Sequence, residues 1–178
     1  MQPIETQRLI VRRFTLEDAD FIVRLLNDPA FIRNIGDRGV RTADDAREYL
    51  RKGPLASYER HGFGLGLVVV RDSGAPAGTC GLIRRPVLED VDIGYAFLPE
   101  HCGKGYATEA ASAVLSFARA TLGLRRVVAV VNPDNEPSIG VLRKLGFTYE
   151  RMVRLDPAEP EIKLFAVSWA TREQTHRD

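Results

Sequence analysis

Hydrophobic positions along the chain recur with two periods, and the shorter period predicts strands. Seven apolar runs of strand length occur, at 9–14, 63–71, 77–84, 91–98, 126–131, 149–155 and 161–169. The run at 126–131 is almost wholly apolar, which is typical of a strand that is covered on both faces. Turn-forming residues at 72–76 separate two of the runs by the length of a hairpin turn. The chain is therefore expected to form a sheet that contains an antiparallel hairpin.

Between these runs the sequence carries the signals that begin helices. Thr15 and Thr42 each precede a segment with an acidic first turn, as the N-cap position and the helix dipole favour. They predict helices over 16–27 and 42–52. A shorter helical segment is expected at 29–35, between the two.

Two further helices are predicted in the second half of the chain. The segment 105–121 has an apolar face with helical spacing, made by Ala111, Val114, Leu115, Ala118 and Leu122. Gly123 is expected to end this helix. Asn135 is expected to cap a shorter helix that Gly146 ends. The strand–helix–strand unit over 91–131 should then be parallel and right-handed.

The order of the elements predicts an α/β fold, a mixed sheet with helices on its faces. A length of 178 residues suits one domain with a sizeable core. We see no domain boundary, so residues 1–170 are expected to form a single domain. The polar segment 171–178 is expected to form a frayed tail.

The charge and the cysteine content of the chain indicate which kinds of partner and which cellular compartment to expect. The chain has 25 basic and 24 acidic residues, which gives no electrostatic case for nucleic acid or an anionic membrane. Its two cysteines, Cys80 and Cys102, make no disulfide framework, which favours a reducing compartment. The start of the chain lacks a secretory signal pattern, and the longest apolar stretch, 65–70, is too short to span a bilayer. A cytoplasmic monomer or homodimer is expected, without nucleic-acid or membrane partners.

The connector Gly103-Lys104-Gly105 is the densest candidate for anion binding. Its glycines allow a phosphate to approach the backbone N–H groups at the start of the following helix. The P-loop pattern does not fit, because its first glycine and its hydroxyl residue are absent. The dinucleotide fingerprint does not fit either, because Thr108 stands at its third small position. A phosphorylated ligand is expected at this loop, with an ordinary structural loop as the alternative.

Three motifs resemble those of the GNAT superfamily of N-acetyltransferases. Residues 93–95 (Ile-Gly-Tyr), Pro99 and residues 103–110 (Gly-Lys-Gly-Tyr-Ala-Thr-Glu-Ala) resemble its acetyl-CoA signature. Residues 135–147 resemble its second motif. Residues 5–12 (Glu-Thr-x-Arg-Leu-x-Val-Arg) resemble the start of the subgroup that contains the ribosomal-protein N-terminal (alanine/serine) acetyltransferases. The resemblance covers nearly the whole chain in the order and spacing of the family.

This resemblance implies a more detailed fold and a co-substrate. It implies a mostly antiparallel sheet of about seven strands with helices on both faces. The fourth strand (91–98) would splay from the fifth (126–131), with a bulge expected at Gly94. The pantetheine arm of acetyl-CoA would lie in the gap, and its pyrophosphate would bind at the start of the next helix. Acetyl-CoA and an amine acceptor are the implied partners, and no metal is implied.

The resemblance also assigns residues to acetyl-CoA. They are Phe97, Leu98, Cys102, Gly103, Lys104, Gly105, Tyr106, Ala107, Thr108, Asn135 and Lys144. A backbone N–H near Phe97 or Leu98 is expected to hold the oxyanion. Glu100 stands where the family motif begins with Gln or Arg, so its carboxylate is expected to point away from the phosphates. Cys102 is a candidate reactive thiol with a lowered pKa, but direct transfer needs no protein nucleophile.

Acetyl transfer to an amine requires a neutral amine, and hence a base. The carboxylates at the start of the fourth strand are Glu89, Asp90 and Asp92. Asp92 is the predicted base, because relatives often place a carboxylate before the Ile-Gly-Tyr run. Water is an alternative base, and a solvent-facing strand carboxylate is the alternative interpretation of Asp92.

The departing thiolate requires a proton donor. Many members of the family carry a Tyr seven residues after the motif Asn, but Leu142 stands at that position here. Ser138, three residues after Asn135, matches the donor of the resembled subgroup and is the predicted acid. The alternatives are that Ser138 and Asn135 only begin a helix, and that water, Tyr95 or Tyr106 is the acid.

Acceptor recognition is expected from residues 27–60 and from the final hairpin. A basic stretch there, formed by Arg33, Asn34, Arg38 and Arg41, suits an acidic acceptor or forms a solvated helix face. The predicted function is an N-acetyltransferase that acts on a protein N-terminus or a small-molecule amine by direct transfer in a ternary complex. The alternative is a non-catalytic acyl-CoA sensor of the same fold. The sequence does not identify the acceptor.

Overall fold

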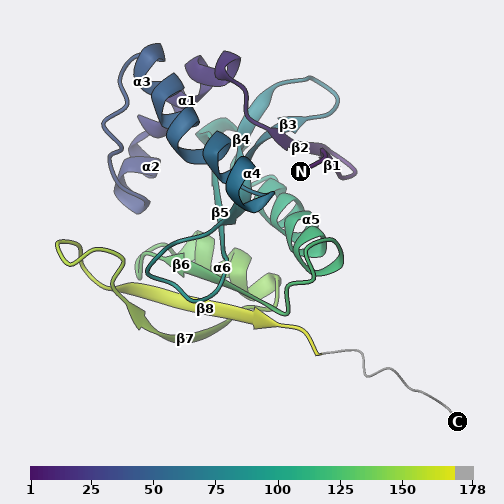
Figure 1. The fold of residues 1–178 in the computed structure, drawn as a ribbon, viewed down its shortest axis with the longest axis vertical. Coiled ribbons are helices and arrows are strands. Elements are labelled where there is room, and N and C mark those ends of the chain that lie inside the picture. The colour runs from purple at the N-terminus through teal and green to yellow at the C-terminus, as the bar shows by residue number, and fades with distance from the viewer. Residues whose placement is uncertain (171–178) are drawn as a thin grey trace, which may run out of the picture.

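The computed structural model describes residues 1–170, which form an eight-stranded sheet with helices on both faces (Figure 1). The strands are β1 (Ile4–Glu5), β2 (Leu9–Arg13), β3 (Leu65–Val70), β4 (Pro76–Ile83), β5 (Asp92–Phe97), β6 (Arg126–Val131), β7 (Thr148–Val153) and β8 (Ile162–Ser168). The helices are α1 (Ala19–Leu26), α2 (Pro29–Asn34), α3 (Ala43–Leu50), α4 (Ala56–His61), α5 (Tyr106–Ala120) and α6 (Glu136–Lys144). The predicted tail at 171–178 lies outside the described residues.

The strand order is β1-β2-β3-β4-β5-β6-β8-β7, and β5 and β6 form the parallel pair among antiparallel neighbours. The prediction of a mixed, mostly antiparallel sheet with a parallel strand–helix–strand unit is therefore confirmed. The strand that the prediction missed is β1, which is two residues long and pairs with β2 through Ile4 and Glu5. So short a strand carries no readable alternation of polar and apolar residues.

The helices cover the sheet from two sides. One core cluster packs α5 and α6 against the sheet and includes Val114, Leu115 and Leu142. The other packs α1, α2 and α3 against the opposite face and includes Leu25 and Leu50. Within residues 1–170, no helix is both long and apolar enough to cross a membrane.

The helix that begins after Thr42 runs further than predicted. It continues from α3 through a π-helical turn at Arg51–Leu55 into α4, and ends at Gly62, whose φ is +76°. Pro54 lies inside this segment and has no N–H to donate, which a wider π turn accommodates. The predicted helix ended at 52, directly before Gly53 and Pro54, whereas burial of Pro54 and Tyr58 favours its continuation.

The sheet divides between β5 and β6. The two strands share one register pair, Asp92 with Val128, and the Val128 N–H donates to the Val91 carbonyl over 2.9 Å. Beyond this point β5 follows β4 while β6 follows β8, each through six register pairs. The predicted splaying of the two strands is therefore confirmed.

The predicted bulge at Gly94 is wrong. The β4–β5 ladder runs in unbroken register, with Gly94 opposite Gly81. A Cβ atom on Gly94 would lie 2.9 Å from Cδ1 of Ile83, the end of a side chain that can move aside. The strands diverge because each follows its outer neighbour, without an extra residue in β5.

Candidate active site

The opening between β5 and β6 exposes one edge of β5. In an antiparallel pair, successive residues direct their backbone groups alternately toward the partner strand and away from it. The Leu98 N–H donates to the Ala77 carbonyl over 2.9 Å, so it faces β4. By the same alternation, the backbone groups of Ile93, Tyr95 and Phe97 face the opening. Phe97 therefore remains a candidate oxyanion donor, and Leu98 does not, because its N–H is already bonded.

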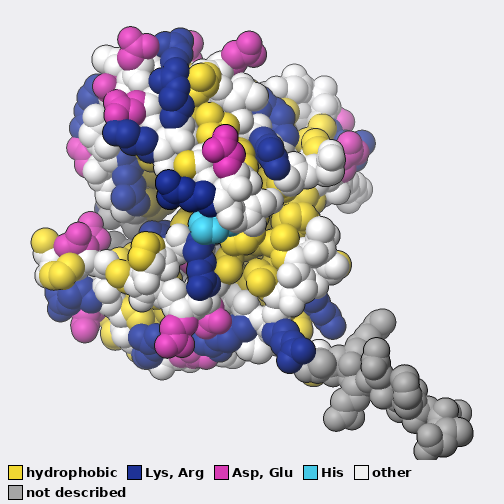
Figure 2. All heavy atoms as spheres, in the orientation of Figure 1, with side chains coloured by type: hydrophobic (Ala, Val, Ile, Leu, Met, Phe, Trp, Pro, Cys, Tyr) yellow, Lys and Arg dark blue, Asp and Glu magenta, His cyan; other side chains and the backbone are white. Residues whose placement is uncertain are grey.

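A cavity of about 560 Å³ lies at this opening. Its wall comes from β5, β6, the start of α6, α2 and the β7–β8 loop, and includes Asp92, Tyr95, Asn135 and Ser138. Figure 2 shows the molecule hollowed on the left, between α2 and the β7–β8 loop. The structure thus brings the two predicted catalytic residues, Asp92 and Ser138, to one cavity.

Tyr95 and Ser138 form a hydroxyl pair inside this cavity. Their oxygen atoms are 2.9 Å apart, and the Tyr95 hydroxyl also lies 3.2 Å from the Ser138 carbonyl oxygen. Burial raises the pKa of Tyr95 to about 12, so the phenol is protonated at neutral pH. When Tyr95 donates to Ser138 Oγ, the Ser138 hydroxyl proton is left available to a ligand.

Ser138 is held by its position at the start of α6. Its N–H donates to Oδ1 of Asn135 over 3.3 Å, which makes Asn135 the N-cap of the helix. The capping role predicted for Asn135 is therefore confirmed. Its side-chain oxygen is used by this bond, and its NH₂ group can still donate to a ligand. The N-cap fixes the backbone of Ser138 beside β5.

Asp92 is buried, with 1% of its surface exposed, which rules out a solvent-facing carboxylate. Its Oδ2 accepts a hydrogen bond from Nε of Arg85 over 2.6 Å, while its buried Oδ1 has no hydrogen-bond partner within residues 1–170. Burial raises the pKa of Asp92 to about 6, against the opposing effect of the Arg85 charge. A carboxylate with a pKa near neutrality and a free oxygen suits a general base.

Both glycines of the loop before α5 have left-handed backbone conformations. Gly103 and Gly105 have φ angles of +72° and +78°, in the left-handed region that favours glycine. Helix α5 begins at Tyr106, so its first N–H groups point out of the helix toward the loop. A Cβ atom on Gly105 would lie 3.3 Å from Nη2 of Arg8. Left-handed glycines before the free N–H groups of a helix are an arrangement that can bind a phosphate.

Arg8 is the residue of this region that sequence reasoning missed. Its Nη1 donates to the Lys104 carbonyl over 2.8 Å, and its Nε pairs with Glu109 over 2.6 Å. Its guanidinium also lies 4.8 Å from the ring centroid of Tyr106. The motif at 5–12 contained Arg8, but its contacts are about a hundred residues away in the chain, so no local spacing indicated them.

Glu100 and Cys102 lie just before the loop. Glu100 forms an ion pair with Arg24 of α1, so its carboxylate points outward as predicted. The Cys102 thiol donates to the Leu98 carbonyl over 3.5 Å. Partial burial raises the pKa of this thiol, and the carboxylates of Asp28 and Glu100 raise it further. The predicted lowering of its pKa is wrong, because Cys102 follows a 3₁₀ turn (Pro99–His101) and does not lie at the start of α5.

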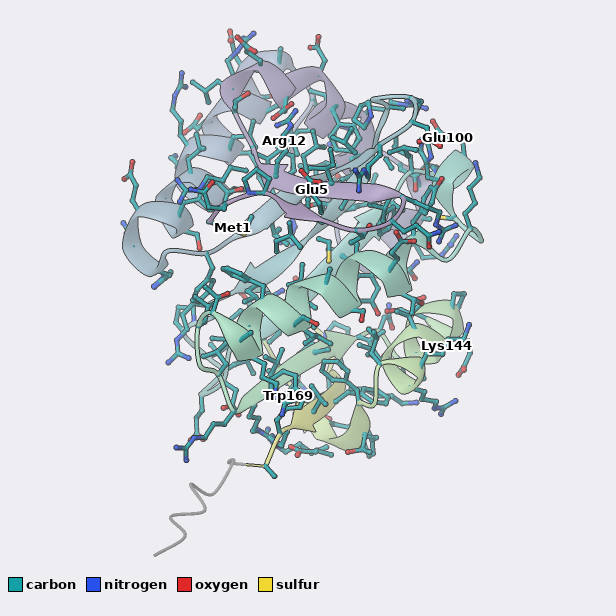
Figure 3. All side chains as sticks on the ribbon, turned by 90° about the vertical axis from the view of Figure 1, so that its right-hand side faces the viewer. Met1, Glu5, Arg12, Glu100, Lys144 and Trp169 are labelled. Atoms are coloured by element: carbon teal, nitrogen blue, oxygen red, sulfur yellow. The ribbon has the colours of Figure 1, made fainter. Side chains whose placement is uncertain are left out.

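The remaining residues predicted for acetyl-CoA lie around the loop and on α6. Tyr106, Ala107 and Thr108 form the first turn of α5. Lys144 is the last residue of α6, and Figure 3 shows it on the same side of the molecule as Glu100. Lys104 and Lys144 are both exposed, so their ammonium groups are accessible from this side.

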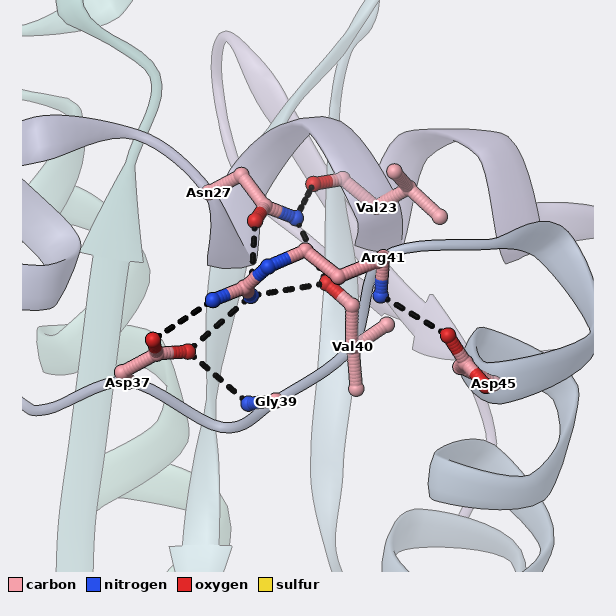
Figure 4. Close-up of polar contacts among 7 residues, drawn as sticks. All are labelled: Val23, Asn27, Asp37, Gly39, Val40, Arg41 and Asp45. Carbon is pink, nitrogen blue, oxygen red and sulfur yellow. Dashed lines mark hydrogen bonds and ion pairs between the residues drawn. The ribbon is translucent and has the colours of Figure 1, made fainter.

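The basic stretch divides into two parts. Arg33, Asn34 and Arg38 line the cavity. Arg41 instead forms an ion pair with Asp37 and donates to the Asn27 side chain over 2.9 Å (Figure 4). Arg41 therefore ties the segment after α2 to the end of α1, and the prediction that it meets the acceptor is not supported.

Comparisons with known proteins agree with this geometry. The model of the acetyltransferase (GNAT) domain family matches residues 8–148. YoaA of Bacillus subtilis, an uncharacterized N-acetyltransferase, is 33% identical over 152 residues, which cover 85% of each chain. The crystal structure of an acetyltransferase from Agrobacterium tumefaciens has a TM-score of 0.81 at 23% identity over 95% of each chain. RimL, a ribosomal L7/L12 alpha-N-protein acetyltransferase in complex with coenzyme A, has a TM-score of 0.79 at 19% identity, over 93% of this chain and 97% of that one. Both solved structures share the fold of this chain.

Proposed function

We propose that this chain, which belongs to the GNAT acetyltransferase family, moves the acetyl group of acetyl-CoA directly to the α-amine of its acceptor. The observation that carries the proposal is the cavity at the β5–β6 opening, where a buried carboxylate and a hydroxyl pair share one wall. The carboxylate belongs to Asp92, and the hydroxyls belong to Tyr95 and Ser138. Together they meet the two proton requirements of acetyl transfer.

The acetyl-CoA site combines the free edge of β5 with the glycine loop. The pyrophosphate would bind N–H groups of residues 103–108, where two left-handed glycines precede the start of α5. The pantetheine arm would pair with backbone groups of β5 that face the opening, beside the Asn135 amide. The Phe97 N–H would donate to the oxyanion, because it faces this opening and points away from β4.

Asp92 would accept the proton that the amine loses as the C–N bond forms. An α-amine has a reference pKa of about 7.7–8.0, and a lysine amine one of about 10.4. With a pKa of about 6, Asp92 can deprotonate the first far more readily than the second. This match supports an α-amine acceptor, on a peptide or on a small molecule.

Ser138 would donate a proton to the thiolate as the C–S bond breaks. Tyr95 would donate its 2.9 Å hydrogen bond to the Ser138 oxygen during this step and keep its own proton. After the products leave, Asp92 would release the amine's proton to solvent and Ser138 would regain a proton from solvent, so both groups return to their starting state. The phenol stabilises the Ser138 oxygen as it loses its proton, which supports the pair as the acid.

A turnover assay with acetyl-CoA and a panel of peptides and amines tests this function. We expect release of free thiol with α-amines, and a fall in kcat/KM on the order of 10²-fold in Asp92→Asn. Glu89→Gln is the matched control, since Glu89 is exposed at the same end of the sheet, and it should stay within about twofold. A protein that binds acetyl-CoA and releases no thiol with any amine would instead be the acyl-CoA sensor.

A further inference from the structure

A second cavity, of about 680 Å³, adjoins the first. It lies between α3, the π turn and α4 on one side and the end of β4 on the other. Residues that line both cavities are Arg38, Tyr49, Pro54, Leu65, Ile83 and Arg85. Arg85 reaches from this shared wall to the Asp92 carboxylate, so the second cavity begins beside the proposed base.

The second cavity is lined by an excess of positive charge. Its cationic side chains are Arg38, Lys52, Arg60, Arg84 and Arg85, and its acidic ones are Asp45 and Glu48. Figure 2 shows Lys and Arg side chains gathered at the centre of this face. The two carboxylates are already bonded: Glu48 pairs with Lys52, and Asp45 accepts the N–H groups before α3. Five cationic side chains against two carboxylates leave a net positive charge at this cavity.

Three of the arginines have no carboxylate partner within residues 1–170. These are Arg38, Arg60 and Arg84, which come from the segment before α3, from α4 and from the residue after β4. Nη1 of Arg84 donates to the Glu89 carbonyl over 2.7 Å, which holds its guanidinium without cancelling its charge. Guanidinium groups bind carboxylate and phosphate in a bidentate manner.

We infer that the acceptor carries an anionic group, a carboxylate or a phosphate, which Arg38, Arg60 and Arg84 bind while its amine lies near Asp92. This inference rests on the proposed function, because it places the amine in the first cavity. A polyamine is disfavoured as an acceptor, since three unpaired cations repel it. The sequence indicated an acidic acceptor through the stretch that contains Arg38, and the structure adds Arg60 of α4 and Arg84 after β4 to the same cavity.

The test uses four peptides that differ only in the second residue, which is glutamate, phosphoserine, glutamine or lysine. We expect kcat/KM to be at least tenfold higher for the glutamate or phosphoserine peptide than for the glutamine peptide, and lowest for the lysine peptide. Whether glutamate or phosphoserine is better identifies the anion. In the double variant Arg60→Gln/Arg84→Gln this preference should fall at least fivefold, through KM and with kcat nearly unchanged.

Arg151→Gln is the matched control, because Arg151 is exposed on the edge strand β7 and lines neither cavity. It removes one exposed positive charge, where the double variant removes two, and should keep the preference. A kcat/KM for both anionic peptides that equals that of the glutamine peptide, or an equal loss in Arg151→Gln, would overturn the inference. Calorimetry of the same peptides in the presence of CoA separates the two proposals. Arginine-dependent binding without turnover contradicts only the function, and turnover without charge preference contradicts only the anion site.

Discussion

The hydroxyl groups of Tyr95 and Ser138 are hydrogen-bonded to each other in the structure. Buried between β5 and α6, Tyr95 keeps its proton at neutral pH and can share it with Ser138 Oγ. A serine hydroxyl is a weak acid in water, so its use as a proton donor depends on this partner and on its position. The Asn135 cap supplies the position.

Tyr95→Phe and Ser138→Ala should each lower kcat by about 10²-fold, the low end for loss of a positioned acid. Because the two hydroxyls act as one unit, the double variant should lose little more than either single variant. The measurement is kcat together with the melting temperature on the same samples. If Ser138→Ala keeps more than a third of the parent kcat while CoA still binds, the serine only supports the helix.

Ionisation of Asp92 should produce an acidic limb in the pH profile of kcat/KM. Its base role needs the ionised form, so kcat/KM should rise with pH through about 6 and level off above it. Asp92→Asn should lose this limb and keep any limb near 8 that belongs to the α-amine acceptor. A profile of the parent that is flat between about pH 5 and 7 would contradict the assignment.

The Asp92 carboxyl should also make the free energy of unfolding depend on pH. This free energy should fall as the pH rises, whereas kcat/KM should increase. Its pKa is raised from 3.8 to about 6 by folding, so the folded protein binds the extra proton in that window. The free energy of unfolding due to Asp92 is therefore highest below about 4 and falls as the pH rises through about 6. Urea titrations of parent and Asp92→Asn across this range measure the difference.

At the residue level, the sequence indicated Asp92, Ser138 and Phe97 through motif position. It did not indicate that Ser138 is paired with Tyr95, because the two are 43 residues apart and meet only when α6 packs beside β5. It also gave the wrong direction for the pKa of Cys102, since local spacing contained neither its burial nor the carboxylate of Asp28.

At the level of elements, the loop before α5 is bonded to a residue from another part of the chain, Arg8. Arg8, which directly precedes β2, donates to the Lys104 carbonyl and pairs with Glu109 in the first turn of α5. The edge of the sheet thus fixes the loop that would bind the pyrophosphate.

Gly105→Ala should weaken CoA binding at least tenfold, on the order of 1.4 kcal/mol. The added Cβ atom would lie 3.3 Å from Arg8 Nη2, and alanine tolerates a φ of +78° poorly. Gly123→Ala is the matched control, because Gly123 has a φ of +67° after α5, away from the loop. Both variants should lose similar melting temperature, and calorimetry should show unchanged CoA affinity in Gly123→Ala alone. Equal affinities in all three proteins would remove the loop assignment.

The sequence predicted the positions of most helices and strands. It did not predict the continuation of α3 into α4 or the regular register of β5 at Gly94. The prediction for 126–131 matches β6 residue for residue, because a buried strand has an unbroken apolar run. The continuation of α3 into α4 was missed, since Gly53 and Pro54 are local signals against a helix. The bulge at Gly94 was wrong, because a glycine inside a strand does not by itself require one, and the β4–β5 ladder is regular there.

At the level of the whole molecule, the sheet behaves as two halves that meet at the start of β5 and β6. One half carries β1 to β5 and the other carries β6, β8 and β7. The cavity opens where the halves diverge, and the basic cavity adjoins it beside Arg85. Neither cavity follows from local sequence, because each is lined by segments that are far apart in the chain.

The central claim is direct transfer at this opening, and initial-rate kinetics with both substrates varied test it most directly. We predict intersecting double-reciprocal lines for an α-amine acceptor, as a ternary complex requires, with Cys102→Ala retaining at least a tenth of the parent kcat. The raised pKa of the Cys102 thiol supports this prediction, because a thiol in its neutral form is a poor nucleophile. Parallel lines, together with an acetylated Cys102 detected by mass spectrometry, would contradict the account.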